Sequence, residues 1–309
     1  MLNRRQLLKT AGAAAAAALV PKIVLANSPE KKHSFRFCLN TSTIRGQNPG
    51  LPGYIDIASK AGYEGIELWV QDVVDYKKAG KSLSNLSKTI EASGLTVESA
   101  IGFAAWLVDD DEKRKQGYMQ MKEEMEIMAQ LGCKRIAAPP FGLKPGNPID
   151  LFKAGERYKE IIKLGRSTGV MPQLEFWGAS GTVFSISQAM MIAAAAGDPD
   201  VHILADVYHM FRGQSDFNTL KMLRGNVIEL FHMNDYVSAI PRELQQDKDR
   251  VYPGDGVAPM KQILSDLAEM GGTKVLSLEL FNQEYWKQDP LLVAKTGLAK
   301  MKSLVSEIS

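Results

Sequence analysis

Two glutamates, one aspartate and one histidine in the second half of the chain each stand at the end of an apolar run typical of a buried β-strand. They are Glu175 after residues 171–174, Asp206 after 201–205, His232 after 227–231 and Glu279 after 275–278. A charged group at the end of a buried strand costs desolvation energy unless it finds a partner. Carboxylates and an imidazole suit a divalent cation. The pattern predicts one metal site, with Mn²⁺ as the first expectation and Mg²⁺, Co²⁺ or Zn²⁺ as alternatives.

Strand-like and helix-like runs alternate along the chain after residue 34. The predicted strands span 35–40, 65–69, 96–101, 135–138, 171–175, 201–206, 227–232 and 275–279. The predicted helices span 54–61, 83–92, 111–130, 149–164, 185–196, 217–223, 259–270 and 290–305. Eight such units are the size of an eight-fold barrel, so we predict an α/β chain folded as a single-domain (β/α)8 TIM barrel. An open doubly wound sheet is the competing architecture. A nucleotide-binding sheet of that kind has a glycine-rich turn after its first strand. Here residues 40–43 read Asn-Thr-Ser-Thr, so that turn is missing.

The barrel explains why residues so far apart in the sequence can meet. Catalytic groups of such barrels lie at the C-terminal ends of the strands. The four candidate residues are separated by 26 to 47 residues, which is about one strand–helix unit each. We therefore expect Glu175, Asp206, His232 and Glu279 to converge at one end of the barrel, on strands five to eight.

The first 26 residues have a different character. Arg4 and Arg5 precede Gln-Leu-Leu-Lys, then an alanine-rich run, then Val-Leu-Ala. This order of charged, apolar and small residues predicts a signal peptide, and the paired arginines resemble a twin-arginine export signal. An amphipathic first helix is the alternative. We assign 1–26 to the signal, 27–34 to a linker and 35–309 to the barrel, and expect export to the periplasm or the exterior through the twin-arginine machinery.

Charge and cysteine content narrow the class of partner. Residues 1–26 hold four basic residues and no acidic ones, so the rest of the chain has 33 basic and 35 acidic residues. Its formal net charge of −2 gives no reason to expect nucleic acid, an anionic membrane or stable membrane insertion. Cys38 and Cys133 lie in apolar strands and are expected to be reduced core residues. A homo-oligomer is left open.

Six short segments carry a resemblance to a known family. They read Gly-Ile-Glu-Leu at 65–68, Leu-Glu at 174–175, Asp-Val-Tyr-His at 206–209, His-Met-Asn-Asp at 232–235, Pro-Gly-Asp-Gly at 253–256 and Leu-Glu at 278–279. Through them the chain resembles the xylose isomerase-like barrel superfamily, which includes ketose 3-epimerases, hydroxypyruvate isomerase and inosose dehydratase. The resemblance implies that Glu175, Asp206, His232 and Glu279 hold one metal ion. It also implies that the two glutamates move the proton of a sugar.

The same resemblance implies that His209, three residues after Asp206, binds substrate oxygens, although a hydrogen-bonded loop histidine is the alternative. Arg250 matches an Arg-x-x-Pro-Gly pattern of some relatives and is either a substrate-binding group or a solvated charge. The charged loop 236–249 before it looks longer than usual. Glu67, at the end of strand two, fits substrate contact or a structural ion pair. Trp177 is expected to wall the pocket, while Trp69 and Trp106 are left undecided.

The resemblance implies a metal-dependent sugar or keto-sugar isomerase or 3-epimerase that works through a metal-stabilised enediolate. Two alternatives remain at this point. A lyase or dehydratase could use the same site on a keto-sugar or inosose. A sugar-binding barrel without turnover is the third hypothesis, and the complete ligand set speaks against it. A free sugar is preferred over a phosphorylated one because no phosphate-binding glycine-rich turn is evident.

Overall fold

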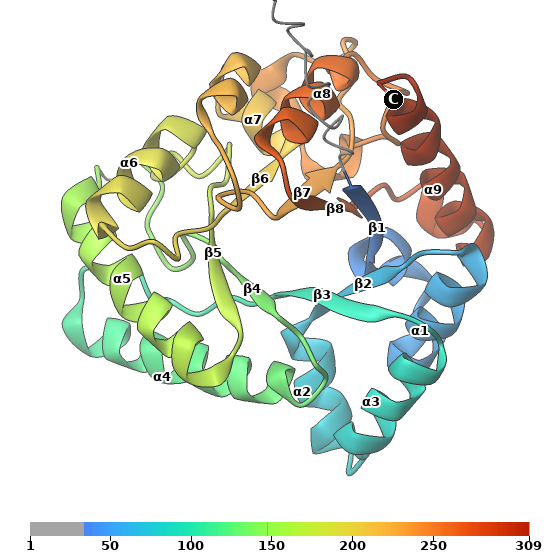
Figure 1. Ribbon diagram of the computed structural model, residues 1–309, viewed down its shortest axis with the longest axis horizontal. Helices are drawn as coiled ribbons and strands as arrows, with labels where there is room; N and C mark the ends of the chain where they lie inside the picture. Colours follow the sequence, from blue (N-terminus) through green and yellow to red (C-terminus); the bar gives the residue numbers. More distant parts are fainter. Residues whose placement is uncertain (1–33, 147, 309) are drawn as a thin grey trace, which may run out of the picture. The chain divides into compact units, whose positions relative to one another are not determined.

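The computed structural model describes residues 34–146 and 148–308. Within this part of the chain, eight parallel strands close into a barrel in chain order, with the eighth paired to the first (Figure 1). The strands are β1 (Ser34–Asn40), β2 (Gly65–Trp69), β3 (Thr96–Ile101), β4 (Arg135–Ala138), β5 (Met171–Glu175), β6 (Ile203–Asp206), β7 (Leu230–Met233) and β8 (Thr273–Leu278). The predicted (β/α)8 barrel is confirmed. The predicted signal and linker lie outside the described residues, except for Ser34.

Helices surround the barrel on its outer face (Figure 1). The α-helices are α1 (Gly50–Ala61), α2 (Val70–Lys78), α3 (Leu83–Ala92), α4 (Asp111–Ala129), α5 (Leu151–Thr168), α6 (Ile186–Ala196), α7 (Val207–Arg212), α8 (Met260–Met270) and α9 (Pro290–Ser306). The 3-10 helices are η1 (Thr41–Gln47), η2 (Phe217–Met222), η3 (Arg242–Leu244), η4 (Asp247–Asp249) and η5 (Tyr285–Lys287). No helix of the described residues has the length and apolar character needed to cross a membrane.

The helix predicted at 217–223 is present, but as the 3-10 helix η2 at Phe217–Met222. The α-helix that follows strand six is α7, which begins directly after β6 and was not predicted. The reason lies in Asp206, whose carboxylate accepts a hydrogen bond from the backbone N–H of His209 at 2.8 Å and so caps α7. A strand-ending residue therefore also starts a helix, which the apolar pattern of the sequence does not reveal. Helix α2 was likewise not predicted.

Apolar residues fill both the barrel and the layer between strands and helices. Cys38 and Cys133 are free and buried, as predicted. Trp106, which the sequence left undecided, is a fully buried core residue whose indole N–H donates to the carbonyl of Pro139 at 3.0 Å. Gly62 ends α1 with a positive φ of 92°, a conformation that glycine adopts without strain. The barrel is therefore a packed scaffold, which leaves the C-terminal ends of its strands as the place for functional residues.

Candidate active site

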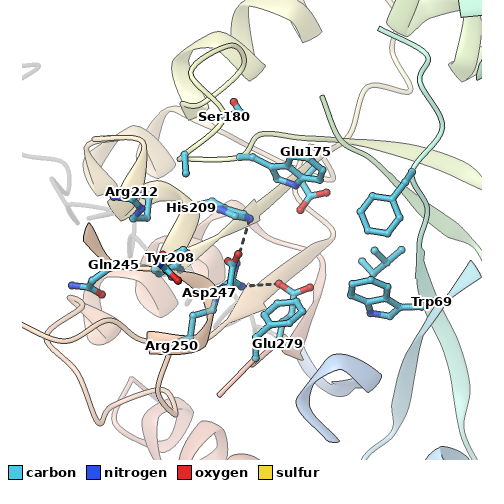
Figure 2. A pocket seen from close by; sticks show the side chains of 16 residues that line it. Trp69, Glu175, Ser180, Tyr208, His209, Arg212, Gln245, Asp247, Arg250 and Glu279 are labelled. Atoms are coloured by element: carbon cyan, nitrogen blue, oxygen red, sulfur yellow. Dashed lines mark hydrogen bonds and ion pairs between the residues drawn. The ribbon is translucent and has the colours of Figure 1, made fainter. Parts of the chain in front are cut away.

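A cavity of about 580 Å³ lies at the C-terminal ends of the strands (Figure 2). Of the predicted site residues, those that line it are Glu175, Trp177, His209, Arg250 and Glu279. Figure 2 shows Glu175 and Glu279 pointing their carboxylates into the same space. The convergence predicted from strand-end spacing is therefore present in the fold.

Asp206, His232 and Glu279 form the most tightly grouped part of the site. Each offers one potential ligand atom, and these atoms all lie within 4.8 Å of one another, among buried side chains. The strand pairing accounts for this, since Asp206 and His232 are direct partners in the β6–β7 register. Glu279 follows β8 on the other side of β7. Two carboxylates and one imidazole can hold a divalent metal ion.

The orientation of His232 fits that role. Its Nε2 lies 3.0 Å from Glu67 Oε2. Its buried Nδ1 has no hydrogen-bond partner within the described residues and lies 3.2 Å from Glu279 Oε2 and 3.6 Å from Asp206 Oδ2. Protein imidazoles that bind metals usually have their second nitrogen held by such a carboxylate. With Nε2 held by Glu67 and Nδ1 facing two carboxylate oxygens, the ring is oriented as a metal-binding histidine requires.

The charge state of His232 follows from the same neighbours. Burial alone lowers the pKa of His232, but Glu279, Glu67 and Asp206 together raise it well above its ordinary value. The doubly protonated, positively charged imidazole is therefore favoured when these carboxylates are its only partners. Nδ1 must lose its proton before it can bind a cation, so metal binding here is coupled to proton release.

Glu67 is fully buried and does not line the cavity. Its Oε2 accepts hydrogen bonds from Asn40 at 2.9 Å and Ser277 at 2.7 Å in addition to its contact with His232. Although burial raises the pKa of Glu67, these partners hold it below its ordinary value. Of the two predicted roles of Glu67, the geometry matches the ion pair, because its carboxylate contacts Nε2 of His232 and so orients the ring.

Two asparagines complete the network and were not among the predicted site residues. Asn40, at the end of β1, links Glu67 to Glu279, with its amide nitrogen 2.9 and 3.1 Å from their carboxylates. Asn234 donates to Asp206 Oδ2 at 2.9 Å. Asn40 could have been found as the polar strand end matching Glu67. Asn234 lies inside a segment that carries the family resemblance.

Arg250 is almost completely buried and donates hydrogen bonds to the carboxylates of Asp206 and Glu279. Its Nη1 donates to Asp206 Oδ2 at 3.0 Å and to Glu279 Oε2 at 2.8 Å. Its Nη2 donates to Asp247 at 2.6 Å. The alternative of a solvated loop charge is therefore wrong. The guanidinium neutralises the two carboxylates and forms part of the cavity wall.

Aromatic rings hold the Arg250 guanidinium in place. Its central carbon lies 4.6 Å from the ring centre of Tyr208 and 5.1 Å from that of Phe281. Cations are attracted to the faces of aromatic rings, more strongly when water is excluded. The side chain is thus fixed by both ion pairs and stacking.

Glu175 differs from the other carboxylates of the site. It ends β5 as predicted, but its carboxylate lies outside the group of ligand atoms within 4.8 Å. Burial, followed by the charges of Glu279 and Asp206 and against the effect of His232, raises the pKa of Glu175 to about 8. Three of the four predicted ligands are therefore brought close together. The fourth faces the same cavity as a carboxyl group able to hold a proton near neutral pH.

His209 and Trp177 come from neighbouring strand ends. His209 lies on α7, with Nε2 3.4 Å from Arg250 Nη2 and Nδ1 accepting the backbone N–H of Gly178 at 3.4 Å. Burial lowers the pKa of His209 below its ordinary value, which favours the neutral ring. Gly178 permits this close approach, because a Cβ there would lie 2.5 Å from the carbonyl oxygen of His209. Both predicted substrate-binding residues therefore face the cavity.

The loop 236–249 borders the cavity, which its residues Gln245, Gln246 and Asp247 line. Its ends are joined by an antiparallel bridge between Asp235 and Val251. Gln245 is buried inside the loop and donates to the carbonyls of Val237 at 2.6 Å and Ile240 at 2.8 Å. The loop is thus internally tied, and it supplies one wall of the cavity.

The Asp235 carboxylate anchors the following Pro-Gly-Asp-Gly segment. It accepts backbone N–H groups from Gly254 at 3.0 Å, Gly256 at 3.1 Å and Ala258 at 2.9 Å. A Cβ at Gly256 would lie 2.2 Å from the carbonyl oxygen of Tyr236, so only glycine fits there. Two of the segments that carry the family resemblance therefore interact directly and position Arg250.

Comparison with known proteins identifies a family and relatives that share this barrel fold. Residues 55–304 match the family described as xylose isomerase-like TIM barrel. Inosose isomerase of Bacillus velezensis is 27% identical over 275 residues, covering 88% of this chain and 98% of the relative. A crystal structure of the IolI protein with a bound zinc atom superimposes with a TM-score of 0.81 at 26% identity, covering 89% of this chain and 99% of that one.

A more distant relative has a different activity. 3-Dehydroshikimate dehydratase of Pseudomonas putida is 20% identical over 76% of this chain and 36% of its own length.

At the N-terminus, residues 1–21 match the twin-arginine translocation signal. That match confirms the predicted export signal and the export of this protein.

Proposed function

The chain belongs to the xylose isomerase-like TIM barrel family, and we propose that it is an exported, metal-dependent enzyme that moves a proton beside the carbonyl group of a sugar or keto-sugar. The reaction is an isomerisation or a 3-epimerisation. The observation that carries the proposal is that Glu279, which is grouped with Asp206 and His232, lines the same cavity as Glu175, a carboxyl group with a raised pKa. The inosose isomerase relatives support a cyclic keto-polyol as substrate.

We assign the metal to Asp206, His232 and Glu279, with Glu175 as a fourth ligand when it is ionised. Mn²⁺ is the first candidate because three of the four donors are carboxylates. The zinc-bound relative makes Zn²⁺ the second. A divalent ion held there would draw electron density from the substrate carbonyl and stabilise negative charge on its oxygen. The export signal supports the periplasm or the exterior as the place of action.

The two glutamates have environments that separate their roles. Arg250 and Asn40 both donate hydrogen bonds to Glu279, which fix the position of its carboxylate. Burial is the main cause that raises the pKa of Glu175, to about 8. Groups with pKa values near the working pH transfer protons most efficiently. Glu175 therefore takes or returns the proton on one side of the substrate, and Glu279 acts as the base on the other.

The remaining side chains bind and orient the substrate. His209 and Arg250 present nitrogen atoms to the cavity, suited to hydroxyl and carbonyl oxygens. Trp177 offers a ring face to the apolar side of a sugar. Glu67 acts indirectly, by holding the ring of His232.

A lyase or dehydratase on a keto-sugar or inosose is the second candidate. The 3-dehydroshikimate dehydratase relatives favour it. The same proton removal leads to elimination when the neighbouring carbon carries a leaving group. A sugar-binding barrel without turnover is the third.

Proton exchange with solvent separates these functions. Metal-loaded protein is incubated with a panel of ketoses and inososes in D₂O, and deuterium incorporation and products are followed by mass spectrometry and NMR. Exchange with an isomer or epimer supports the first function, and an unsaturated product supports the second. If compounds of the panel bind but none of them exchanges a proton, both functions would be contradicted.

Variants of the two glutamates sharpen the same assay. Glu175→Gln and Glu279→Gln should each lower exchange by orders of magnitude, because an amide cannot act as a base. Glu91→Gln, on the exposed face of α3, is the matched control and should exchange normally. Near-normal exchange by Glu175→Gln with metal bound would remove this residue from the mechanism.

A further inference from the structure

Aromatic residues form a second layer above the carboxylates of the site. An aromatic residue lies two positions after Glu67 on β2, after Ile101 at the end of β3, after Glu175 at the end of β5 and after Glu279, which follows β8. These residues are Trp69, Phe103, Trp177 and Phe281, and all four line the cavity. Residues two apart along an extended segment point to the same side, so the layer follows directly from the alternation of the strands. The site therefore has a polar floor and, above it, an aromatic wall.

The wall is continuous. The ring centres of Phe281 and Trp69 are 6.2 Å apart, those of Trp69 and Phe103 are 5.4 Å apart, and those of Phe103 and Trp177 are 6.2 Å apart. Each of the four side chains remains partly exposed, although large aromatic rings gain most from full burial. The four partly exposed rings give the cavity a continuous apolar wall.

The opposite wall is polar. Arg212 of α7 and Gln246 and Asp247 of the loop line it, and the side chains of Gln246 and Asp247 are exposed. Figure 2 shows Arg212 and Asp247 across the cavity from Trp69, with Glu175 and Glu279 between the two sides. These side chains provide hydrogen-bond donors and acceptors for hydroxyl groups. An object between the walls should thus have an apolar face and a hydroxylated edge.

The cavity is larger than one sugar ring needs, because its 580 Å³ falls within the range of about 300–1,000 Å³ that holds drug-sized ligands. We infer that the substrate is a keto-sugar carrying a second sugar ring through a glycosidic bond. The keto ring lies over Glu175 and Glu279, and the second ring lies between Trp69 and Gln246. This inference rests on the proposed function for the identity of the first ring only.

Binding of unreactive sugars tests it without turnover. Isothermal titration of metal-loaded protein compares glucose with maltose, cellobiose and trehalose, which differ in linkage, and with phenyl β-glucoside. At least one disaccharide should bind about ten-fold more tightly than glucose. Equal affinity for glucose and all three disaccharides would overturn the inference. Exchange into free ketoses would be untouched by that result, so a failure here is distinguishable from a failure of the proposed function.

Variants locate the second ring. Trp69→Leu and Gln246→Ala should each remove most of the preference for the disaccharide while leaving glucose binding close to that of the wild type. Gln246 is exposed, so its substitution tests the inference even if Trp69→Leu fails to fold. Phe152→Leu, an exposed aromatic on α5, is the control. If phenyl β-glucoside binds more tightly than every disaccharide and Gln246→Ala has no effect, the wall accepts an aromatic group and the second sugar ring is refuted.

Discussion

Arg250 provides a test in which two properties should change in opposite directions. Its Nη1 donates to Asp206 Oδ2 and Glu279 Oε2 at 3.0 and 2.8 Å. The same two oxygens face His232 Nδ1. A cation bound by these atoms would share its carboxylates with the guanidinium. We therefore expect Arg250→Met to destabilise the metal-free protein and to strengthen metal binding.

The size of each change follows from burial. Removing one partner of a buried ion pair costs about 3–5 kcal/mol, because the other charge is left uncompensated. At about 2 °C per kcal/mol for a chain of this length, the Tm in chelator should fall by about 6–10 °C. Two unit charges 4 Å apart interact by about 4 kcal/mol at an effective dielectric constant near 20. Relief of only a third of that repulsion corresponds to about ten-fold tighter metal binding.

Thermal unfolding in chelator and in excess Mn²⁺ measures the first change, and calorimetric titration with Mn²⁺ measures the second. Metal at about 100 times its Kd should return about 2.7 kcal/mol of the lost stability. Arg212→Met is the matched control, because Arg212 lines the same cavity but donates to the backbone carbonyl of Arg242. An unchanged Tm in chelator, or weaker Mn²⁺ binding by Arg250→Met, would refute the reasoning.

Three further outcomes are expected. His232→Ala removes the Nδ1 that faces Asp206 and Glu279, so elemental analysis after dialysis should find far less than the one divalent ion per chain expected of the wild type; full metal content would contradict the site. Arg4→Lys combined with Arg5→Lys should leave the protein in the cytoplasm, as cell fractionation would detect, and normal export would contradict the twin-arginine assignment. Burial raises the pKa of Glu124 in the folded protein above its unfolded value of about 4.3. Above the folded pKa the buried ionised carboxylate therefore lowers the free energy of unfolding, and below the unfolded pKa this destabilisation disappears. Glu124→Gln should therefore raise the free energy of urea unfolding at pH 7 but not at pH 3.5, and equal effects at both would refute the cause.

Much of the site could be predicted because its residues occupy periodic positions. Glu175 and Asp206 end their strands as predicted, His232 lies in β7 one residue before its end, and Glu279 directly follows β8. The alternation of apolar strands and amphipathic helices was sufficient to predict a barrel, and a barrel brings consecutive strand ends together. Local patterns were less reliable after β6, where Asp206 starts a helix as soon as the strand ends.

The sequence by itself determined the order of the eight strands, the export signal and the four strand-end residues, because each depends on neighbours within a few residues. Tertiary structure alone decided what surrounds them. Glu67 meets His232 from a strand 165 residues away, and Arg250 reaches Asp206 across 44 residues. Such contacts leave no periodic trace, since they depend on barrel closure and on the course of a loop. Only the tertiary structure shows that Glu175 lies apart from the grouped ligand atoms of Asp206, His232 and Glu279.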